Sequence, residues 1–279
     1  MTPTTALYVP GSRPDRFDKA VESGADAVVL DLEDAVAADE KTQAREAVAT
    51  WLEGRAASAV EVWVRVNHDD ALLADDIAAV ASAGITGWWL PKTERAEDVD
   101  RVVELTRAAR GSDPLPVSPL IESGAGVAAA VQIAGAAHVC FLQLGEQDLA
   151  ADLGITPQPE GHELAYARGA VVVASAAAGL EPPLGAVSIE TVDLESLAAD
   201  TRRLRHAGFH GRGCIHPRQL APVAAVFEPS AEERAWAHEI LSLMERGAVA
   251  TDARGHLVDE AVARRARRIL GHIGPPGTR

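Results

Sequence analysis

The chain has 279 residues, of which 47% are hydrophobic and 24% are charged, and its net charge is −15 at pH 7. This length is enough for one large domain, or a domain with an appendage. The acidic balance argues against nucleic-acid binding, because a phosphate backbone demands a basic surface. The sequence shows neither the roughly 20-residue apolar run of a membrane-spanning helix nor a secretion signal, so we expect a cytoplasmic protein without membrane contact.

Eight short apolar runs follow one another along the chain, with segments of helical spacing between them. The runs cover residues 6–11, 27–33, 61–67, 87–92, 115–123, 139–145, 184–188 and 213–217. Most have the length of buried parallel strands. Eight strand-then-helix units in about 220 residues favour a closed (β/α)8 TIM barrel over an open doubly wound sheet. The first run also lacks the G-x-G-x-x-G pattern of a dinucleotide fold, since only Gly11 follows it.

The barrel is predicted to occupy residues 1–228, and a helical extension residues 229–279. Helical spacing indicates one helix over 231–246 and a last helix that begins near Asp259. The last helix has an apolar face and a basic face. The apolar face holds Val262, Ala266, Ile269 and Leu270, and the basic face holds Arg264, Arg265, Arg267 and Arg268. We expect this extension to act as a lid or to contact a neighbouring subunit.

Charged and polar residues stand at the carboxyl ends of the predicted strands, where the reactive groups of a TIM barrel lie. They are Arg13, Arg16, Glu33, Asp34, Arg65, Asn67, Lys92, Glu122, Glu146, Asp148 and His216. Buried charges must be paired or must bind a metal. Their recurrence at one end, strand after strand, predicts an enzyme site.

Two of these carboxylates end neighbouring strands. Glu122 ends the fifth run and Asp148 follows the sixth, so their side chains can converge on one point. Two carboxylates with several waters are a common way to hold Mg²⁺. In the alternative interpretation each carboxylate pairs with an arginine or caps the following helix.

Arg65 stands inside an apolar strand, and its donors suit a carboxylate or a developing enolate oxygen. Alternatively, it neutralises Asp31 or Asp34 at the barrel mouth. Strand alternation places Asp31 and Glu33 on one face, with Asp34 beginning the loop. His216 is most simply a hydrogen-bonded histidine at a strand end.

Seven segments of the chain resemble the citrate lyase β-subunit and malyl-CoA lyase family, also described as the HpcH/HpaI aldolase group. They are 7–16 (LYVPGSRPDR), 29–36 (VLDLEDAV), 64–67 (VRVN), 90–92 (LPK), 121–126 (IESGAG), 145–149 (GEQDL) and 214–219 (CIHPRQ). They span nearly the whole predicted barrel in the expected order. This ordered set is specific for the family and much less so for the substrate.

The resemblance implies a Mg²⁺ ion held by Glu122 and Asp148, onto which the 2-oxo acid docks. Arg65 would then steady the oxygen that gains charge as the carbon–carbon bond breaks, with Glu33 and Asp34 completing the catalytic set. Contacts to the CoA moiety are implied for Arg13, Arg16 and Lys92, with Tyr166 and Arg168 as further contacts.

A C-terminal segment, 255–259 (GHLVD), is similar to the one that delivers a catalytic aspartate from a neighbouring subunit in stand-alone CoA lyases. The resemblance therefore implies that Asp259 moves the proton at the thioester enolate carbon. It also implies a homo-oligomer, a trimer or a multiple of it. As an alternative, Asp259 is the N-cap of the last helix.

The chain departs from the family pattern at three places. Gly-Glu-Gln-Asp stands at 145–148 where the family commonly has Gly-Ala-Glu-Asp, and Arg212 stands where a lysine is common. The acidic residue often found at the seventh strand is missing from 183–187. The proposed metal aspartate survives these changes, whereas the surrounding contacts and the CoA contacts differ.

The leading hypothesis is a Mg²⁺-dependent lyase that cleaves or forms malyl-CoA or citramalyl-CoA, with acetyl-CoA and a 2-oxo acid as the other partners of the reaction. A second is the β subunit of a citrate lyase complex, acting on a citryl thioester. A third is a non-catalytic partner that binds acyl-CoA and regulates another protein.

Overall fold

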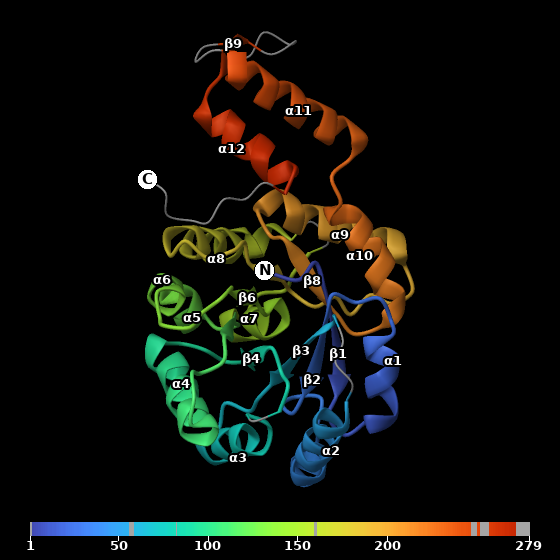
Figure 1. Cartoon of the computed structure of the whole chain (residues 1–279), viewed down its shortest axis with the longest axis vertical. Helices are drawn as coiled ribbons and strands as arrows, with labels where there is room; N and C mark the ends of the chain where they lie inside the picture. The colour runs from blue at the N-terminus through green and yellow to red at the C-terminus, as the bar shows by residue number, and fades with distance from the viewer. Residues whose placement is uncertain are drawn as a thin grey trace. The chain divides into compact units, whose positions relative to one another are not determined.

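The computed structural model describes residues 2–55, 59–81, 83–158, 161–246, 250–251 and 257–271 (Figure 1). The chain divides into two compact units, residues 1–227 and residues 228–279. In the described segments, no helix is long and apolar enough to cross a membrane.

The first unit is a TIM barrel, a closed sheet of eight parallel strands in sequence order (Figure 1). The strands are β1 (Thr5–Pro10), β2 (Ala27–Asp31), β3 (Glu61–Arg65), β4 (Gly87–Leu90), β5 (Val117–Ile121), β6 (Gln143–Leu144), β7 (Leu184–Gly185) and β8 (Gly211–Cys214). β1 pairs with both β2 and β8 and so closes the barrel. The predicted fold is confirmed.

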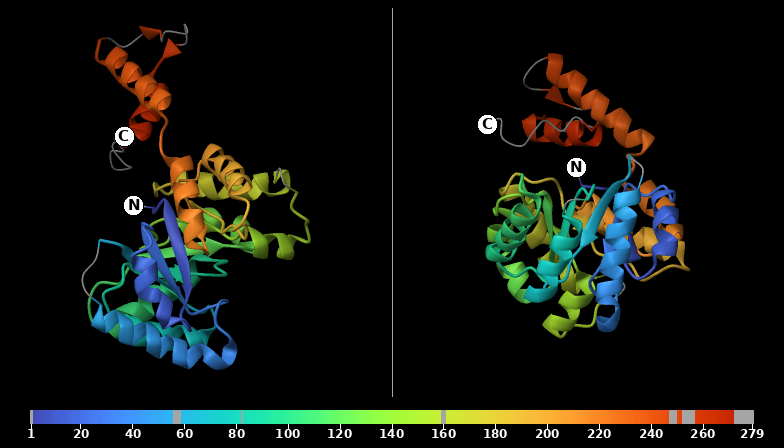
Figure 2. Two further views of the ribbon diagram at one scale, coloured as in Figure 1. Left: turned by 90° about the vertical axis from the view of Figure 1, so that its right-hand side faces the viewer. Right: turned by 60° about the horizontal axis from the view of Figure 1, so that its bottom comes forward.

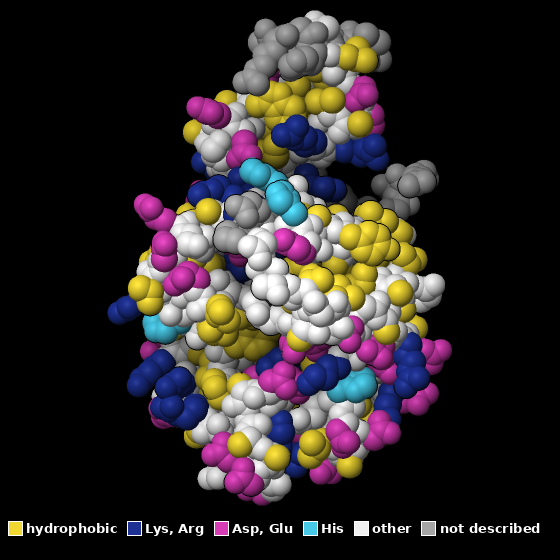
Figure 3. Space-filling view, turned by 180° about the vertical axis from the view of Figure 1, so that it is seen from behind, with side chains coloured by type: hydrophobic (Ala, Val, Ile, Leu, Met, Phe, Trp, Pro, Cys, Tyr) yellow, Lys and Arg dark blue, Asp and Glu magenta, His cyan; other side chains and the backbone are white. Residues whose placement is uncertain are grey.

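Helices surround the barrel and connect its strands (Figure 2). The α-helices of this unit are α1 (Phe17–Val21), α2 (Lys41–Gly54), α3 (Asp70–Val80), α4 (Ala96–Arg110), α5 (Gly124–Ala128), α6 (Ala130–Ala134), α7 (Glu146–Leu153), α8 (Ala165–Ala177), α9 (Leu194–Ala207) and α10 (Leu220–Phe227). Short 3-10 turns cover Pro14–Arg16, Ala38–Glu40, His162–Leu164 and Pro217–Gln219. Figure 3 shows acidic and basic side chains interspersed over one face of this helical layer.

Each strand alternates between two apolar layers, as a barrel with helices outside requires. One layer lies between the sheet and the helices and includes Val28, Leu30, Val62 and Val64. The other fills the barrel and is rich in aromatic side chains. It consists of Ala6, Ala27, Val29, Trp63, Trp89, Phe141 and Leu184, with Tyr8 and Cys140 packed against it. Inward positions therefore recur every second residue up to the carboxyl ends.

The last three strands differ most from the sequence-based expectation. β6 and β7 have two residues each, and β8 begins at Gly211, two residues before the predicted run. The close approach of β8 to β1 explains the glycine, because a Cβ at Gly211 would lie 2.1 Å from the Pro3 carbonyl oxygen. The apolar pattern missed this start because glycine carries no apolar side chain.

The second unit consists of α11 (Ala231–Arg246), β9 (Ala250–Thr251), β10 (Leu257–Val258) and α12 (Glu260–Ile269). β9 and β10 form an antiparallel pair. Ala237, Ile240, Val258, Ala263 and Ala266 form its core, with Val262, Ile269 and Leu270 packed against it. The apolar face predicted for the last helix is the face that packs.

Candidate active site at the barrel mouth

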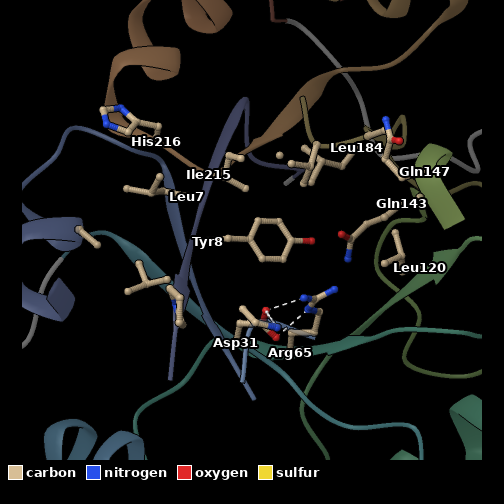
Figure 4. Close-up of a pocket in the computed structure, with 18 of the residues that line it drawn as sticks. Leu7, Tyr8, Asp31, Arg65, Leu120, Gln143, Gln147, Leu184, Ile215 and His216 are labelled. Carbon is tan, nitrogen blue, oxygen red and sulfur yellow. Dashed lines mark hydrogen bonds and ion pairs between the residues drawn. The ribbon is translucent and has the colours of Figure 1, made fainter. Parts of the chain in front are cut away.

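A cavity of about 820 Å³ opens among residues from the carboxyl ends of the strands (Figure 4). Side chains far apart in the sequence line it together. Of the residues predicted for the site, the lining includes Arg13, Arg16, Arg65, Glu122, Asp148, Glu146 and His216. Parallel strands bring their carboxyl ends to one edge, and this accounts for the convergence.

Arg65 and Asp31 form a bidentate ion pair beside the cavity (Figure 4). The two residues are register partners on β2 and β3, and each stands two positions after an inward-facing residue, Val29 and Trp63 respectively. Arg65 Nε lies 2.8 Å from Asp31 Oδ1, and Nη2 lies 2.5 Å from Oδ2. Nη1 lies 3.1 Å from Glu33 Oε2. The predicted neutralisation of Asp31 is therefore present.

This pairing leaves Arg65 with donors to spare. A guanidinium has five N–H groups, and three are directed at the carboxylates of Asp31 and Glu33. Burial alone would lower the pKa of Arg65, but Asp31 raises it above its usual value, so the group stays charged. The other two N–H groups have no hydrogen-bond partner within the described ranges.

A chain of charges continues from Glu33 to β4. Lys92 Nζ pairs with Glu33 Oε1 and lies 3.2 Å from Asp34 Oδ1. Burial raises the pKa of Glu33, although Arg65 and Lys92 oppose the shift. Within the described part of the chain, Glu33, Asp34 and Lys92 do not line the cavity. They support Arg65 from outside it.

Glu122 is buried, and no cation forms an ion pair with it among the residues that the structure describes. It is 5% exposed, and in the described ranges no ion pair reaches it or Asp148. Burial raises the pKa of Glu122 to about 7, with the charges of Asp148 and Glu33 adding to the effect. Its Oε1 accepts a hydrogen bond from the Lys92 backbone N–H at 2.6 Å. This carboxylate is in an environment that favours a cation.

Asp148 lies in the first turn of α7, exposed to the cavity. The N-cap of that helix is Gly145, and no side chain caps it, so the alternative capping role of Asp148 is absent. Gly145 keeps the space beside Glu122 open, because a Cβ there would lie 2.7 Å from Glu122 Oε2.

Lys92 holds Glu122 through an unusual backbone conformation. Its φ is 51°, in the left-handed region that non-glycine residues rarely adopt. This turn directs the Lys92 N–H at Glu122 while its side chain reaches Glu33. Such strain persists only where the surroundings fix it, and it is common at functional sites.

Basic side chains stand at one side of the cavity in this acidic protein. Arg13, Arg16 and Lys19 line it, and all three are exposed. Arg13 makes a bidentate pair with Asp15, at 2.9 Å for each bond. An exposed pair of this kind holds its partner weakly, so these cations remain available to an anionic ligand.

Besides Lys92, two more predicted CoA contacts, Tyr166 and Arg168, lie outside the cavity lining. Tyr166 is 80% exposed on α8, and Arg168 is buried in a bidentate pair with Glu146, at 2.6 and 2.8 Å. Neither lines the cavity among the residues that the structure describes. Arg168 instead pairs with Glu146, the first residue of α7, which stands two residues before Asp148.

Three further residues singled out in the sequence, His216, Asn67 and Asp259, make hydrogen bonds that hold turns, loops or a helix start in place. His216 Nδ1 accepts from the Arg218 N–H at 3.1 Å, so this lining residue also caps a short turn. Asn67 and Arg45 bind the buried Asp76, which ties the loops after β2 and β3 together. In the second unit, Asp259 Oδ1 accepts from the Val262 N–H at 3.0 Å and is the N-cap of α12. Gly255 and His256 lie outside the described residues.

Sequence reasoning missed two lining residues, Tyr8 and Gln143 (Figure 4). The Tyr8 ring packs against the Arg65 guanidinium at 5.2 Å and against Trp89 at 5.2 Å. Gln143 donates to Ser118 Oγ at 2.8 Å. A lone amide in the apolar run 139–145 was the available signal.

Known proteins that are similar to this chain indicate one family, which includes lyases. A family model described as HpcH/HpaI aldolase/citrate lyase matches residues 4–217. The chain is 34% identical over 276 residues to a citrate lyase subunit beta-like protein of Deinococcus radiodurans, covering 96% of each chain. It is 35% identical over 301 residues to an L-malyl-CoA/beta-methylmalyl-CoA lyase of Cereibacter sphaeroides, covering 95% of this chain and 92% of the relative.

A solved structure with high similarity is that of protein CitE from Mycobacterium tuberculosis in complex with magnesium, acetoacetate and coenzyme A. The TM-score is 0.82 at 32% sequence identity, and the match covers 96% of this chain and 97% of that one. The likeness therefore extends over both compact units of the chain.

Proposed function

Since the chain belongs to the HpcH/HpaI aldolase/citrate lyase family, we propose that it is a Mg²⁺-dependent carbon–carbon lyase. Its proposed substrate is an acyl-CoA thioester of the malyl-CoA or citramalyl-CoA type. Cleavage breaks the bond between the carbinol carbon and the carbon next to the thioester. The hydroxyl loses its proton, the thioester enolate gains one, and the products are acetyl-CoA and a 2-oxo acid.

The observation that carries this proposal is the pair Glu122 and Asp148, two carboxylates that line one cavity and have no cationic partner in the described segments. No group of three or more His, Cys, Asp or Glu side chains suited to a metal occurs among these residues. Two carboxylates without nitrogen or sulfur ligands suit Mg²⁺, which keeps waters and substrate oxygens in its shell. When bound, the ion supplies Lewis-acid polarisation of the substrate oxygens.

Arg65 supplies the second part of the proposed chemistry. Its two uncommitted N–H groups hold the oxygen on which charge changes as the bond breaks or forms. Asp31, Glu33 and Lys92 hold the guanidinium in place through direct or indirect pairing. Asp34 completes this support through Lys92.

The cations Arg13 and Arg16 are the proposed contacts for the phosphates of CoA. The net charge of −15 repels such an anion, so a local basic group is needed to bind it. The similarity of CitE, whose complex contains magnesium and coenzyme A, supports this assignment. We further propose that the protein is a homo-oligomer, and that it is a trimer as the family resemblance implies. In this proposal Asp259 of one subunit exchanges the proton at the enolate carbon in the active site of its neighbour.

The test is an assay of the purified protein with malyl-CoA, citramalyl-CoA and citryl-CoA, with Mg²⁺ or with a chelator. We expect turnover of one of the first two, and complete dependence on the metal. Turnover of citryl thioester alone would favour the citrate lyase β-subunit alternative. Binding of CoA esters without turnover of any would favour the regulatory alternative.

Asp259 needs its own test, because it also caps α12. Asp259→Asn keeps an N-cap side chain and removes the carboxylate that exchanges a proton. We expect its turnover to fall at least tenfold while Mg²⁺ affinity and thermal stability stay unchanged. An unchanged rate would remove Asp259 from the mechanism and leave only its capping role.

A further inference from the structure

The inner part of the cavity contains a polar pair in an otherwise aromatic and aliphatic layer. Tyr8 and Gln143 both line the cavity, and Figure 4 shows the Tyr8 hydroxyl directed towards the Gln143 amide. Around them lie Trp89, Leu184 and Leu120. In the described segments, neither the Tyr8 hydroxyl nor the Gln143 amide makes a hydrogen bond to Arg65 or to the two proposed metal ligands.

The hydrogen-bond network fixes the orientation of the Gln143 amide. Ser118 Oγ donates its proton to the Phe141 carbonyl oxygen at 3.0 Å, and so it can only accept from Gln143. Gln143 Nε2 accordingly donates to Ser118 Oγ at 2.8 Å, and it also lies 3.3 Å from the Ser118 carbonyl oxygen. Gln143 Oε1 is then the atom left over, and nothing in the described ranges donates to it.

Tyr8 supplies the complementary group. Its ring contacts both the Arg65 guanidinium and, in a T-shaped arrangement, the Trp89 ring. Gly213 makes room for it, because a Cβ there would lie 3.3 Å from Tyr8 Cε2 and 2.7 Å from Val187 Cγ2. Burial raises the pKa of the phenol, so it keeps its proton. In the part of the chain that is described, no hydrogen-bond partner holds the Tyr8 hydroxyl.

A donor and an acceptor therefore face the same space without partners. Both groups face the cavity, so a ligand that fills this space and bonds both must accept from Tyr8 and donate to Gln143. A hydroxyl group does both. A methyl group does neither, and a carboxylate would place a negative oxygen against Gln143 Oε1.

We propose that Tyr8 and Gln143 form a hydroxyl-recognition subsite, and that the preferred 2-oxo acid carries a hydroxyl group on the carbon next to its keto group. This rests on the proposed function in one respect, that the acid is held beside Glu122. Gln143 pairs in register with Leu120 on β5. Glu122 follows the end of that strand, two residues after Leu120, and both residues line the cavity. Two strand residues span about 6.6 Å, within reach of a substituent of a small 2-oxo acid.

The experiment compares the binding of 3-hydroxypyruvate, pyruvate and oxaloacetate to the full chain with Mg²⁺, by titration calorimetry. These three acids differ at one position, in bearing a hydroxyl, a hydrogen or a carboxylate. We expect 3-hydroxypyruvate to bind at least about tenfold tighter than the other two, because an unmet buried polar group penalises them. Equal affinities, or a preference for oxaloacetate, would overturn the proposal.

Variants locate the preference in the two side chains. In Tyr8→Phe we expect the preference for 3-hydroxypyruvate over pyruvate to fall below threefold, because 3-hydroxypyruvate loses more affinity than pyruvate does. Ser118→Ala, which frees the Gln143 amide to turn, should reduce the preference less. Thr106→Val removes a buried hydroxyl on α4 that donates to the Val102 carbonyl oxygen, and Thr106 is not a lining residue of the cavity. This control variant should leave the preference unchanged.

The outcomes separate this subsite from the lyase activity. If Tyr8→Phe weakens all three acids equally, a water molecule occupies the space and the proposal is wrong. If none of the three acids binds, the proposed subsite is likewise rejected. Selective binding without any thioester cleavage would retain the subsite and reject the lyase, whereas cleavage without selectivity would do the reverse.

Discussion

Two groups of acidic side chains lie at the barrel mouth, and they differ in their partners. At the carboxyl end of β2, Asp31 and Glu33 both pair with Arg65, and Glu33 also pairs with Lys92. At the ends of β5 and β6, Glu122 and Asp148 have none among the described residues. Similar carboxylates thus have different surroundings, and under the proposed function the first group supports the arginine while the second binds Mg²⁺.

Lys92 connects the two groups. Its side chain pairs with Glu33, and its backbone N–H bonds Glu122. Substitutions of the unpaired carboxylates, Glu122 and Asp148, should therefore remove metal binding at little cost in stability. Substitutions in the paired group should instead lower the free energy of unfolding.

The largest effect is expected from Glu122→Gln and Asp148→Asn. Each removes one of the two proposed protein ligands of Mg²⁺, so turnover should fall by three orders of magnitude or more, equivalent to roughly 4 kcal/mol. Mn²⁺ binding followed by electron paramagnetic resonance should weaken in parallel, with unchanged circular dichroism. Wild-type metal affinity in both variants would contradict the assignment.

Arg65→Met tests the paired group. It leaves Asp31 and Glu33 buried without their shared cation, so the free energy of unfolding should fall by about 3–5 kcal/mol. Urea denaturation measures this. The matched variant Arg13→Met breaks an exposed pair and should cost less than about 1 kcal/mol. Similar losses in the two variants would show that the buried network contributes no more than a surface pair.

The pH dependence of stability tests the unpaired group. Burial raises the pKa of Glu122 from 4.5 to about 7, so the folded, metal-free protein holds this proton more tightly than the unfolded chain. The resulting stability is fully present below pH 4.5 and is lost as the pH rises to about 7, a change of roughly 3 kcal/mol. Glu122→Gln should lack this component.

Denaturation of both proteins in chelator between pH 4.5 and 8 makes the comparison. The variant should gain on the wild type by this amount as the pH rises, and Mg²⁺ should restore the wild type at high pH. A constant difference between the two proteins would mean that Glu122 titrates normally.

The smallest effect concerns the backbone of Lys92. Lys92→Ala and Lys92→Gly both remove the side-chain pairs, but only glycine adopts a φ of 51° without strain. After allowing for the entropy of glycine, we expect the glycine variant to be more stable by up to about 1 kcal/mol. Thermal denaturation decides this, and a more stable alanine variant would show that the conformation carries no strain.

The sequence by itself determined the barrel and part of the charged lining of its mouth. Strand length, helical spacing and the apolar pattern predicted eight parallel units, and parallel strands place their carboxyl ends together. The sequence alone therefore assigns Glu122, Asp148 and Arg65 to one end of the barrel. The short β6 and β7 were predicted too long, because apolar residues continue beyond the paired backbone.

Only the tertiary structure decided which charges neutralise one another. Arg65 lies 34 residues from Asp31, and Lys92 lies 59 from Glu33, while Arg168 reaches Glu146 over 22 residues. Such pairs depend on strand register and on the direction of each side chain. Local sequence patterns report which residues face inward, but the partner that each one meets is set by packing across strands distant in the sequence.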